Sequence, residues 1–537
     1  MAYFASEAYA NFDWHQRLSS AIVDGGTTDP AYRPEGSATL DVDGNERVSG
    51  ASVDLGCWEA DQSQFECAGR LESYGALENA NVTFIATAFG PSSDVVFRWD
   101  YGNGTIENTR EATHVYAYPA AGYFTVKLAA SPDGGSNWTE WYTVPTRLAV
   151  APARMFVDSN CATPAFPYRT RATAATTLGA AVGALTNNVS RNETIIDGVD
   201  IVILSGSRSN DTGIFLMTAV TIRGETGNPA DAEIVDNVVG SRALTLSHPD
   251  AVVSNLTISG SGLRTNGGCG GHVRIFNGLV ANCVIKDGRA GDTAKGYGNG
   301  GNVWMSGGRL ERCFVTGGTA NSGGFAGQNS FGMGLYASGG IIDSCFFKDN
   351  RDDNNDGRNY GSVCLAGAAT LVNCTVTGGY SRYTEAAGIY VNAASAKVVN
   401  CVAYGNYGGK SPVVNTAGSN FGTGNLGRYY YCAAAFTNES CATWTVLTDA
   451  DFVKYSTFTN STYAQLNTYM SSEAYAGFNW HQKRHSQLVN KGTKDTDYRP
   501  ADSVELDLDG NPRVLNHWID LGCWEINCAP PTVFSIR

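Results

Sequence analysis

Charge is scarce in this sequence, and no part of it is uniformly apolar. Lys, Arg, Asp and Glu make up only 16% of the 537 residues, with a net charge of −14. This negative balance argues against nucleic acid or an anionic membrane surface as a partner held by bulk electrostatics. No apolar run approaches the roughly 20 residues of a membrane-spanning helix, so we expect no membrane insertion by this chain.

Cysteine is present, but not in the arrangement of a metal site. The 14 cysteines include no C-x-x-C pair, the spacing that many zinc sites use. The first residues, MAYFASEAYANF, lack the basic start and apolar core of a signal peptide. Three cysteine pairs have spacings that permit short-loop disulfides and favour an oxidising, exported setting: Cys57/Cys67, Cys432/Cys441 and Cys523/Cys528.

One short phrase recurs between residues 252 and 406. It reads VANCVIKDG, LERCFVTGG, IDSCFFKDN, LVNCTVTGG and VVNCVAYGN in successive copies, and an earlier copy, VSNLTISG, has leucine in place of cysteine. A short, nearly fixed period indicates one structural unit stacked on itself. The marker residues are 27, 30, 32, 29 and 27 positions apart: Leu256, Cys283, Cys313, Cys345, Cys374 and Cys401.

The repeated phrase has the pattern of a strand. Its apolar side chains alternate, as in Cys313 and Val315, and each copy ends in Gly or Asn, which tolerate left-handed turns. A second alternating run precedes each copy, with no helical pattern between the two. We therefore expect an all-β chain built on a parallel β-helix, in which the thiols pack inward as small apolar groups.

A longer segment occurs twice. Residues 6–60 recur without a gap as residues 472–526, an offset of 466. Both copies contain D-x-D-G-N, which predicts a turn; half of a calcium loop is the alternative, but no Glu follows at the spacing of an EF-hand. Because the second copy follows the repeats, we interpret residues 1–60 as the tail of a preceding β-helix unit. We therefore expect the sequence to be a fragment whose export signal lies upstream.

Residues 74–152 have short alternating strands separated by Gly, Pro and Asn, the pattern of a β-sandwich. The segments W-D-Y-G-N-G from Trp99, H-V-Y-A-Y-P from His114 and G-Y-F-T-V from Gly122 resemble the motifs of the PKD domain, with Asn103 replacing an Asp. The resemblance implies an immunoglobulin-like domain over residues 61–153. Such domains space or bind in surface proteins and secreted glycan-degrading enzymes, and do not catalyse.

The remaining sequence carries a second resemblance. The start of the repeat region, the N-C ladder and the D-L-D-G-N-P-R ending resemble exported bacterial β-helix proteins of the pectin-lyase-like class with a "choice-of-anchor" tail. This implies a right-handed parallel β-helix over residues 154–450, a tail over 451–537 and an extracellular or cell-surface location. It implies no defined reaction. The one convincing helix, residues 176–185, is expected to cap the end of the solenoid.

An acidic loop is the first candidate site. Asp352, Asn354 and Asp356 fit the first half of a D-x-N-x-D-G calcium loop, but the twelfth position is the apolar Val363. A solvated acidic loop explains the same residues. Calcium is the one cofactor that the sequence suggests.

A carboxylate pair is the second candidate site. Asp287 and Asp349, beside Lys286 and Lys348, occupy equivalent positions two coils apart. Regular stacking would place the carboxylates about 9.6 Å apart, at the edge of the window for inverting glycosidases. Other coils have Gly there, so turn formation explains both aspartates, and the sequence motifs of β-helix polygalacturonases are missing. A polysaccharide lyase or glycoside hydrolase is therefore the less favoured function.

An outward column is the third candidate site. Alternation places Arg274, Trp304, Tyr336, Cys364 and Tyr390 on the outer face of successive coils. Aromatic rings with a polar edge suit stacking on sugars, although a loop or the neighbouring domain would explain the same rings by covering them. We favour a non-catalytic surface protein that binds glycan or mediates adhesion, with a polysaccharide as partner.

Overall fold

The computed structural model separates into two compact units, Met1–Ala151 and Pro152–Arg537. The structure describes residues 20–526, except for the following positions: 21–22, 30, 33–36, 49–50, 62–63, 187–194, 261, 263–267, 292–297, 321–328, 353–357, 382–386, 409–420, 424–427, 431, 435–443, 447–450, 455–477 and 516–517.

The first unit contains a β-sandwich. Phe84 and Trp99 come from different sheets and meet edge to face, with ring centroids 5.2 Å apart, in a core that also buries Leu128. The Trp99 turn is closed locally, because Gly102 N donates to Asp100 Oδ1. The sheets are β1 (Glu66–Leu71), β3 (Asn81–Phe89) and β6 (Thr113–Ala117); β5 (Ile106–Thr109), β4 (Val96–Asp100), β8 (Lys127–Ser131) and β9 (Tyr142–Thr143); and β2 (Gly75–Leu77), β10 (Leu148–Ala151) and β7 (Gly122–Phe124).

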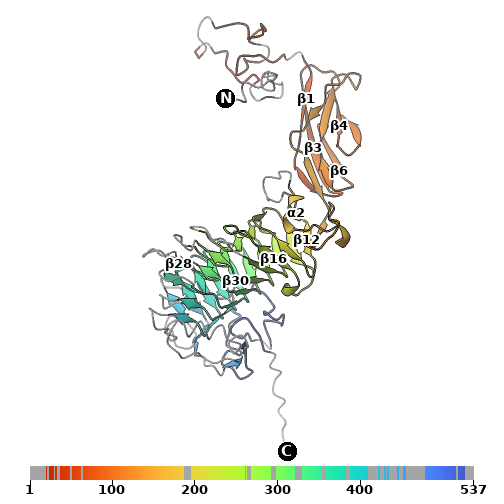
Figure 1. Ribbon diagram of the computed structural model, residues 1–537. Helices are drawn as coiled ribbons and strands as arrows, with labels where there is room; N and C mark the ends of the chain where they lie inside the picture. Colours follow the sequence, from red (N-terminus) through yellow and green to blue (C-terminus); the bar gives the residue numbers. More distant parts are fainter. Residues whose placement is uncertain are drawn as a thin grey trace, which may run out of the picture. The chain divides into compact units, whose positions relative to one another are not determined.

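The second unit is a parallel β-solenoid with three long sheets, which we name A, B and C. They contain ten, ten and eight strands, and each strand pairs in parallel with its equivalents in the adjacent coils. Figure 1 shows this stacking from β12 to β30. Sheet A comprises β11 (Arg154–Val157), β12 (Asp200–Ile203), β15 (Thr221–Gly224), β18 (Val252–Ser254), β21 (Leu279–Ala281), β25 (Arg309–Glu311), β30 (Ile341–Asp343), β34 (Thr370–Val372), β38 (Lys397–Val399) and β42 (Arg428–Tyr430).

From β12 to β41, each strand of sheet A is followed in the chain by a strand of sheet B and then by one of sheet C. Sheet B comprises β13 (Arg208–Asn210), β16 (Glu233–Asp236), β19 (Thr257–Gly260), β22 (Val284–Lys286), β26 (Phe314–Thr316), β31 (Phe346–Lys348), β35 (Thr375–Thr377), β39 (Val402–Ala403), β43 (Cys432–Ala434) and β44 (Trp444–Val446). Sheet C comprises β14 (Ile214–Leu216), β17 (Leu244–Leu246), β20 (Val273–Ile275), β24 (Val303–Met305), β29 (Leu335–Ala337), β33 (Val363–Leu365), β37 (Ile389–Val391) and β41 (Phe421–Thr423).

Small sheets extend the coils between sheets B and C. They pair β23 (Arg289–Ala290) with β27 (Thr319–Ala320), β28 (Asn329–Phe331) with β32 (Arg358–Tyr360), and β36 (Tyr380–Ser381) with β40 (Tyr407–Gly408).

The turn from sheet A to sheet B, which we call the A–B corner, uses one left-handed residue per coil. Asparagine suits this position because its short polar side chain tolerates positive φ. The asparagine of the repeated N-C pair is therefore the corner, and the cysteine after it points inward. The φ angles lie between 47° and 57° at Asn255, Asn282, Arg312, Ser344, Asn373 and Asn400.

The thiols form the inward column expected from the sequence. All five repeat cysteines are buried and free, and Cys432 adds a sixth to the same column. Cys283 Sγ lies 3.8 Å from the Val253 carbonyl of the preceding coil, and Cys432 Sγ lies 3.6 Å from that of Val398. Burial raises the pKa of the Cys283 thiol, the first of the column.

The short-loop disulfide that the sequence permits between Cys57 and Cys67 is not formed in the structure. Cys57 is exposed, whereas Cys67, Cys432 and Cys523 are buried. Cys432 belongs to the inward column, and Cys523 is buried with its amide bonded to Thr375. These packing positions, rather than short loops, account for the two cysteines. Their sequence partners, Cys441 and Cys528, lie outside the described residues.

The expected capping helix is α2 (Leu178–Gly183), which contacts β11 of the first coil. Its first amides are bonded to an acid from the solenoid: Leu178 N and Gly179 N donate to the two carboxylate oxygens of Asp211, at 2.8 and 2.7 Å. An anion at a helix N-terminus satisfies unpaired amides and complements the helix dipole. Two 3-10 turns, η2 (Arg171–Thr173) and η3 (Pro229–Asp231), complete the described helical elements.

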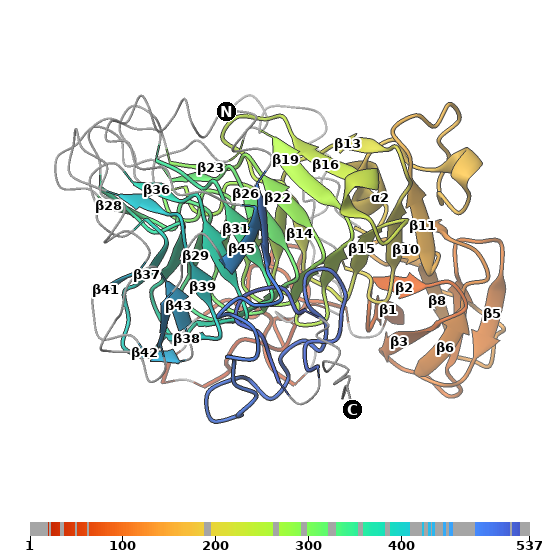
Figure 2. The ribbon, with the colours of Figure 1, turned by 90° about the horizontal axis from the view of Figure 1, so that it is seen from below.

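The C-terminal segment, residues 478–526, folds back onto the solenoid. Trp480, Leu521 and Trp524 join Phe346 of β31 and Val402 of β39 in one buried apolar cluster. The segment begins with β46 (Asn479–Gln482), which pairs with β45 (Phe452–Lys454) in antiparallel orientation. Figure 2 shows the segment, in blue, beside β39 and β45.

Candidate functional site

An outward column of side chains crosses sheet C. The register pairs Arg274 with Trp304 and Trp304 with Tyr336, and continues through Cys364 to Tyr390. The flanking residues of each strand, such as Val303 and Met305 of β24, are fully buried. The alternation expected from the sequence therefore aligns these five residues on one side of the sheet.

Three of these side chains form a row. The rings of Trp304 and Tyr336 are stacked, with centroids 6.4 Å apart and planes inclined by 14°. The guanidinium of Arg274 lies 4.5 Å from the Trp304 ring and 4.4 Å from the ring of Phe276, within cation–π range. Adjacent strands hold equivalent residues about 4.8 Å apart, so the sheet fixes the row rigidly. We call Arg274, Trp304 and Tyr336 the cation–aromatic row.

Tyr390 belongs to a different cluster. Its ring centroid lies 4.8 Å from that of Tyr360 in β32 and 6.1 Å from that of Phe331 in β28. Cys364, between Tyr336 and Tyr390, is fully buried. Cys364 is therefore covered, the outcome that the sequence left open as the alternative to an exposed column. Alternation predicts the register of sheet C, but it does not indicate the small sheet that brings Phe331 and Tyr360 to Tyr390.

Burial sets the charge along the row. It raises the pKa of the Tyr336 and Tyr390 hydroxyls, so both rings are neutral at physiological pH. Arg242 donates to the carbonyls of Cys269 and Gly270, at 2.6 and 3.1 Å. Burial, followed by the charge of Arg274, lowers the pKa of Arg242 to about 10. Two cations at the Arg274 end therefore give that end of the row a local positive charge.

Apolar side chains that the sequence analysis did not select extend this face. Phe276 follows Arg274 by two residues and is 40% exposed. Phe215 of β14 is in register with Thr245 and, through it, with Arg274. The same period of two that selected Trp304 would have found both residues.

The candidate catalytic residues lie on sheet B. Lys286 and Lys348 are in register on either side of Thr316, so Asp287 and Asp349 lie two coils apart as expected. Their φ angles are 64° and 57°. In the intervening coil Gly317 takes the equivalent position with φ 64°. Turn geometry therefore accounts for both aspartates.

The charged partners of this set are local. Lys286 Nζ lies 3.7 Å from Glu233 Oε1, and Lys348 Nζ lies 3.7 Å from Asp349 Oδ2. His272, the one histidine near the set in sequence, is fully buried, and burial lowers its pKa to about 4. Its Nε2 lies 3.0 Å from the Lys286 carbonyl oxygen. His272 is therefore an interior residue rather than an acid–base group open to substrate.

The structure describes part of the candidate calcium loop. Asp352 is buried, and its amide donates to the Tyr380 carbonyl at 2.9 Å. Asn354 and Asp356 lie outside the described residues, so the calcium site stays a prediction. Among the residues that the structure describes, no group of three or more His, Cys, Asp or Glu is placed to hold a metal ion.

The D-x-D-G-N segments form turns, as favoured from the sequence. Asp41 Oδ1 accepts from Asn45 N at 2.7 Å, and Asp507 Oδ1 accepts from Asn511 N at 2.6 Å. Each acid therefore bonds the backbone of its own turn.

Comparison with known families identifies the sandwich of the first unit. Residues 71–144 match the PKD domain. No curated protein sequence matches the chain. Within the described ranges, no helix is long and apolar enough to cross a membrane. The chain thus combines a PKD domain with a parallel β-solenoid.

Proposed function

We propose that this is an exported or cell-surface protein that binds a polysaccharide through the cation–aromatic row without cleaving it. The observation that carries the proposal is the stack of Arg274, Trp304 and Tyr336 on consecutive strands of sheet C. A rigid row with one side chain per coil suits an extended polymer better than a small ligand.

The chemistry of the row matches that of a sugar chain. Aromatic rings offer apolar area to the carbon–hydrogen face of a sugar, and the tyrosine hydroxyl offers hydrogen bonds at the ring edge. Arg274 and Arg242 supply positive charge at one end, where the carboxylate of an acidic sugar would form a charge-assisted hydrogen bond. We therefore expect acidic glycans to bind more tightly than neutral ones, despite the net charge of −14.

The exported location rests on the domain composition. PKD domains are typical of extracellular proteins, and this one is joined to a solenoid. We also propose the right-handed, pectin-lyase-like class for the solenoid, supported by the N-C ladder and the D-L-D-G-N-P-R ending. Parallel crossover connections are right-handed in nearly all proteins.

A non-cleaving role is favoured over a lyase or hydrolase because the candidate acids lie on sheet B and the row lies on sheet C. Asp287 and Asp349 also have turn geometry as their explanation. Cleavage would require an acid–base pair beside the bound chain.

Affinity electrophoresis on a panel of neutral and acidic polysaccharides tests the proposal. We expect at least one acidic polymer to retard the wild type, and Trp304→Ala/Tyr336→Ala to lose most of this retardation. The matched control is Trp138→Ala in the PKD domain, where Arg98 lies 3.7 Å over the Trp138 ring.

The two variants distinguish a glycan site in the solenoid from one in the PKD domain. Unchanged binding by the double variant, with loss in Trp138→Ala, would move the site to the PKD domain and contradict the proposal. Shortened polymer in the wild-type lanes, abolished in Asp349→Ala, would establish the hydrolase or lyase instead.

A further inference from the structure

The two copies of the repeated segment have the same local fold in the parts that the structure describes. Three hydrogen bonds occur at matching positions of the two copies, so the similarity of the two sequences is accompanied by a similarity of local structure. In the first copy these bonds are Gly26 N to Val53 O, Asn45 N to Asp41 Oδ1 and Arg47 Nη2 to Gly56 O; in the second they are Gly492 N to Ile519 O, Asn511 N to Asp507 Oδ1 and Arg513 Nη1 to Gly522 O.

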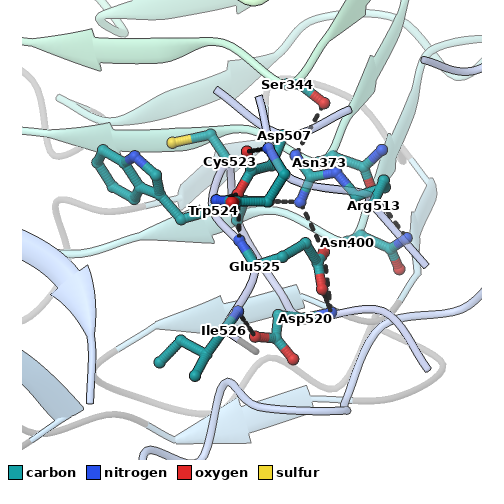
Figure 3. Close-up of polar contacts among 12 residues, drawn as sticks. Ser344, Asn373, Asn400, Asp507, Arg513, Asp520, Cys523, Trp524, Glu525 and Ile526 are labelled. Atoms are coloured by element: carbon teal, nitrogen blue, oxygen red, sulfur yellow. Dashed lines mark hydrogen bonds and ion pairs between the residues drawn. The ribbon is translucent and has the colours of Figure 1, made fainter. Parts of the chain in front are cut away.

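The second copy binds the A–B corner of the solenoid. Asn400, a corner residue, exchanges two hydrogen bonds of 2.8 Å with the backbone of Thr493. The buried Arg513 donates from Nη1 to Glu525 within its own segment and from Nη2 to Ser344 Oγ of the corner, both at 2.8 Å. Figure 3 shows Arg513 between these two partners.

Further contacts surround this arginine. The carboxylate of Asp343, which precedes the corner Ser344, accepts hydrogen bonds from Ser503 Oγ and from Val504 N. Cys523 N donates to Thr375 Oγ1 at 3.1 Å. A Cβ on Gly522 would lie 2.6 Å from the same Thr375 oxygen, so the backbone approaches the solenoid closely.

The same face of the first copy is open. Leu55 is 50% exposed, whereas its equivalent Leu521 is 1% exposed. Cys57 is exposed and Cys523 is buried. A Cβ on Gly56 would meet no atom of the described residues within 4 Å. The residues that differ in burial between the two copies therefore lie on the surface by which the second copy docks onto the solenoid.

An open pocket of about 540 Å³ marks this face. Its lining includes the equivalents of five residues that contact the solenoid in the second copy, namely Ser37, Ala38, Arg47, Gly56 and Cys57 in place of Ser503, Val504, Arg513, Gly522 and Cys523. The pocket thus corresponds to the space that the corner residues Asp343 and Ser344 occupy in the second copy.

We infer that this face, which we call the open docking face, binds the A–B corner of a second β-solenoid. The expected occupant has an acidic residue followed by a left-handed Ser or Asn, with a Thr one coil further on, because those groups pair with the second copy. The bonding groups on the docking side are retained: Thr27, Ser37, Arg47, Gly56 and Cys57 are identical to their equivalents.

Two differences between the copies refine the partner. Asp502, which pairs with Arg309 of the solenoid, is replaced by Gly36, and Val504 by Ala38. The partner therefore needs no arginine at the Arg309 position. A second copy of this chain is disfavoured as partner, because its own corner at Ser344 and Asn400 is already bound by its own tail.

A segment exchange in the full chain tests whether the first copy has a competent docking face. Residues 472–526 are replaced by residues 6–60, in a Cys57→Ala background so that the grafted thiol is distinguishable. Native alkylation followed by mass spectrometry should find the grafted thiol protected about 100-fold relative to Cys57 of the wild type. The control Asn400→Gly keeps the left-handed corner but removes the amide, and should lower this protection about tenfold.

A milder variant covers the case in which the exchanged chain does not fold, which labelling of Cys313 and Cys345 would reveal. Asp502→Gly/Val504→Ala gives the second copy the docking residues of the first. Continued protection of Cys523 supports the inference. Labelling of Cys523 as fast as Cys57, with Cys313 still protected, overturns it. Protection of wild-type Cys57 that rises with protein concentration would assign the face to a second copy and also overturn the proposal.

Discussion

His272 and Asn302 occupy equivalent interior positions and make equivalent bonds. Val273 pairs with Val303 in sheet C, so the residues before them are also equivalent. His272 Nε2 lies 3.0 Å from the Lys286 carbonyl, and Asn302 Nδ2 donates to that of Thr316 at 2.9 Å. A neutral imidazole therefore makes the hydrogen bond that a side-chain amide makes in the next coil. Unlike the amide, the imidazole can be protonated in acid, and a buried charge would destabilise the coil.

Acid should destabilise the solenoid through His272. Burial lowers the histidine pKa from 6.5 to about 4, so the native state binds fewer protons than the unfolded state between these values. The contribution of neutral His272 is present above pH 6.5 and is lost as the pH falls toward 4. We expect a loss of roughly 2–3 kcal/mol by pH 4.5.

The matched variant is His272→Asn, which places the residue of the next coil in the same position. Denaturant unfolding at pH 7 and pH 4.5 should show a smaller acid-induced loss of stability in this variant than in the wild type. Equal losses in the two proteins would show that other groups dominate the acid response.

Substitutions of Asp287 test whether this residue serves only to form its turn. Its φ is 64°, and Gly317 takes the equivalent position in the next coil. We expect Asp287→Gly to change the free energy of unfolding by less than about 1 kcal/mol, because glycine adopts this conformation without strain. Asp287→Val should lower it by about 1–2 kcal/mol. A large loss in the glycine variant would indicate a role for the carboxylate that turn geometry does not supply.

At the scale of the element, the sequence was informative where one residue determines the local geometry. The N-C pair predicts the strand register because Asn takes the left-handed corner and Cys points inward at every coil. The sequence assigns Cys432, 31 residues after Cys401, to a possible disulfide pair rather than to the column because no copy of the repeated phrase surrounds it. The burial of Cys364 and the Asn400–Thr493 contact depend on segments distant in sequence, which alternation within a strand does not report.

Arg513 should be the most sensitive residue of the C-terminal tail. Its side chain is fully buried and links Glu525, Gly522 and Ser344. Arg513→Met leaves Glu525 buried without its cation, and we expect a loss of about 3–5 kcal/mol in the free energy of tail opening. Native-state hydrogen exchange of residues 518–526 measures this quantity.

Arg47→Met is the control, because Arg47 occupies the equivalent position in the first copy but is partly exposed and 3.8 Å from Glu59. Solvent screening should limit its effect on the first copy to about 1 kcal/mol. Equal effects in both copies would indicate that the solenoid contact contributes nothing to the role of Arg513.

At the scale of the whole molecule, the cation–aromatic row and the docked tail lie on different sheets of the solenoid. The cation–aromatic row lies on sheet C, while the tail covers the A–B corner and part of sheet B. The proposed ligand site and the docked tail therefore lie on different sides of the solenoid. We expect tail variants such as Arg513→Met to leave glycan affinity unchanged, provided that the coils remain folded.

Isothermal titration with an acidic oligosaccharide is the most direct measurement of the glycan binding that we propose for the cation–aromatic row. Trp304→Ala should weaken binding about tenfold, the equivalent of one lost aromatic contact. Arg274→Gln should weaken it and reduce its dependence on salt. The control is Trp138→Ala in the PKD domain, a tryptophan that also carries an arginine over its ring but lies outside the row. Equal affinities in the wild type and Trp304→Ala, or a loss confined to Trp138→Ala, would contradict glycan binding by the row.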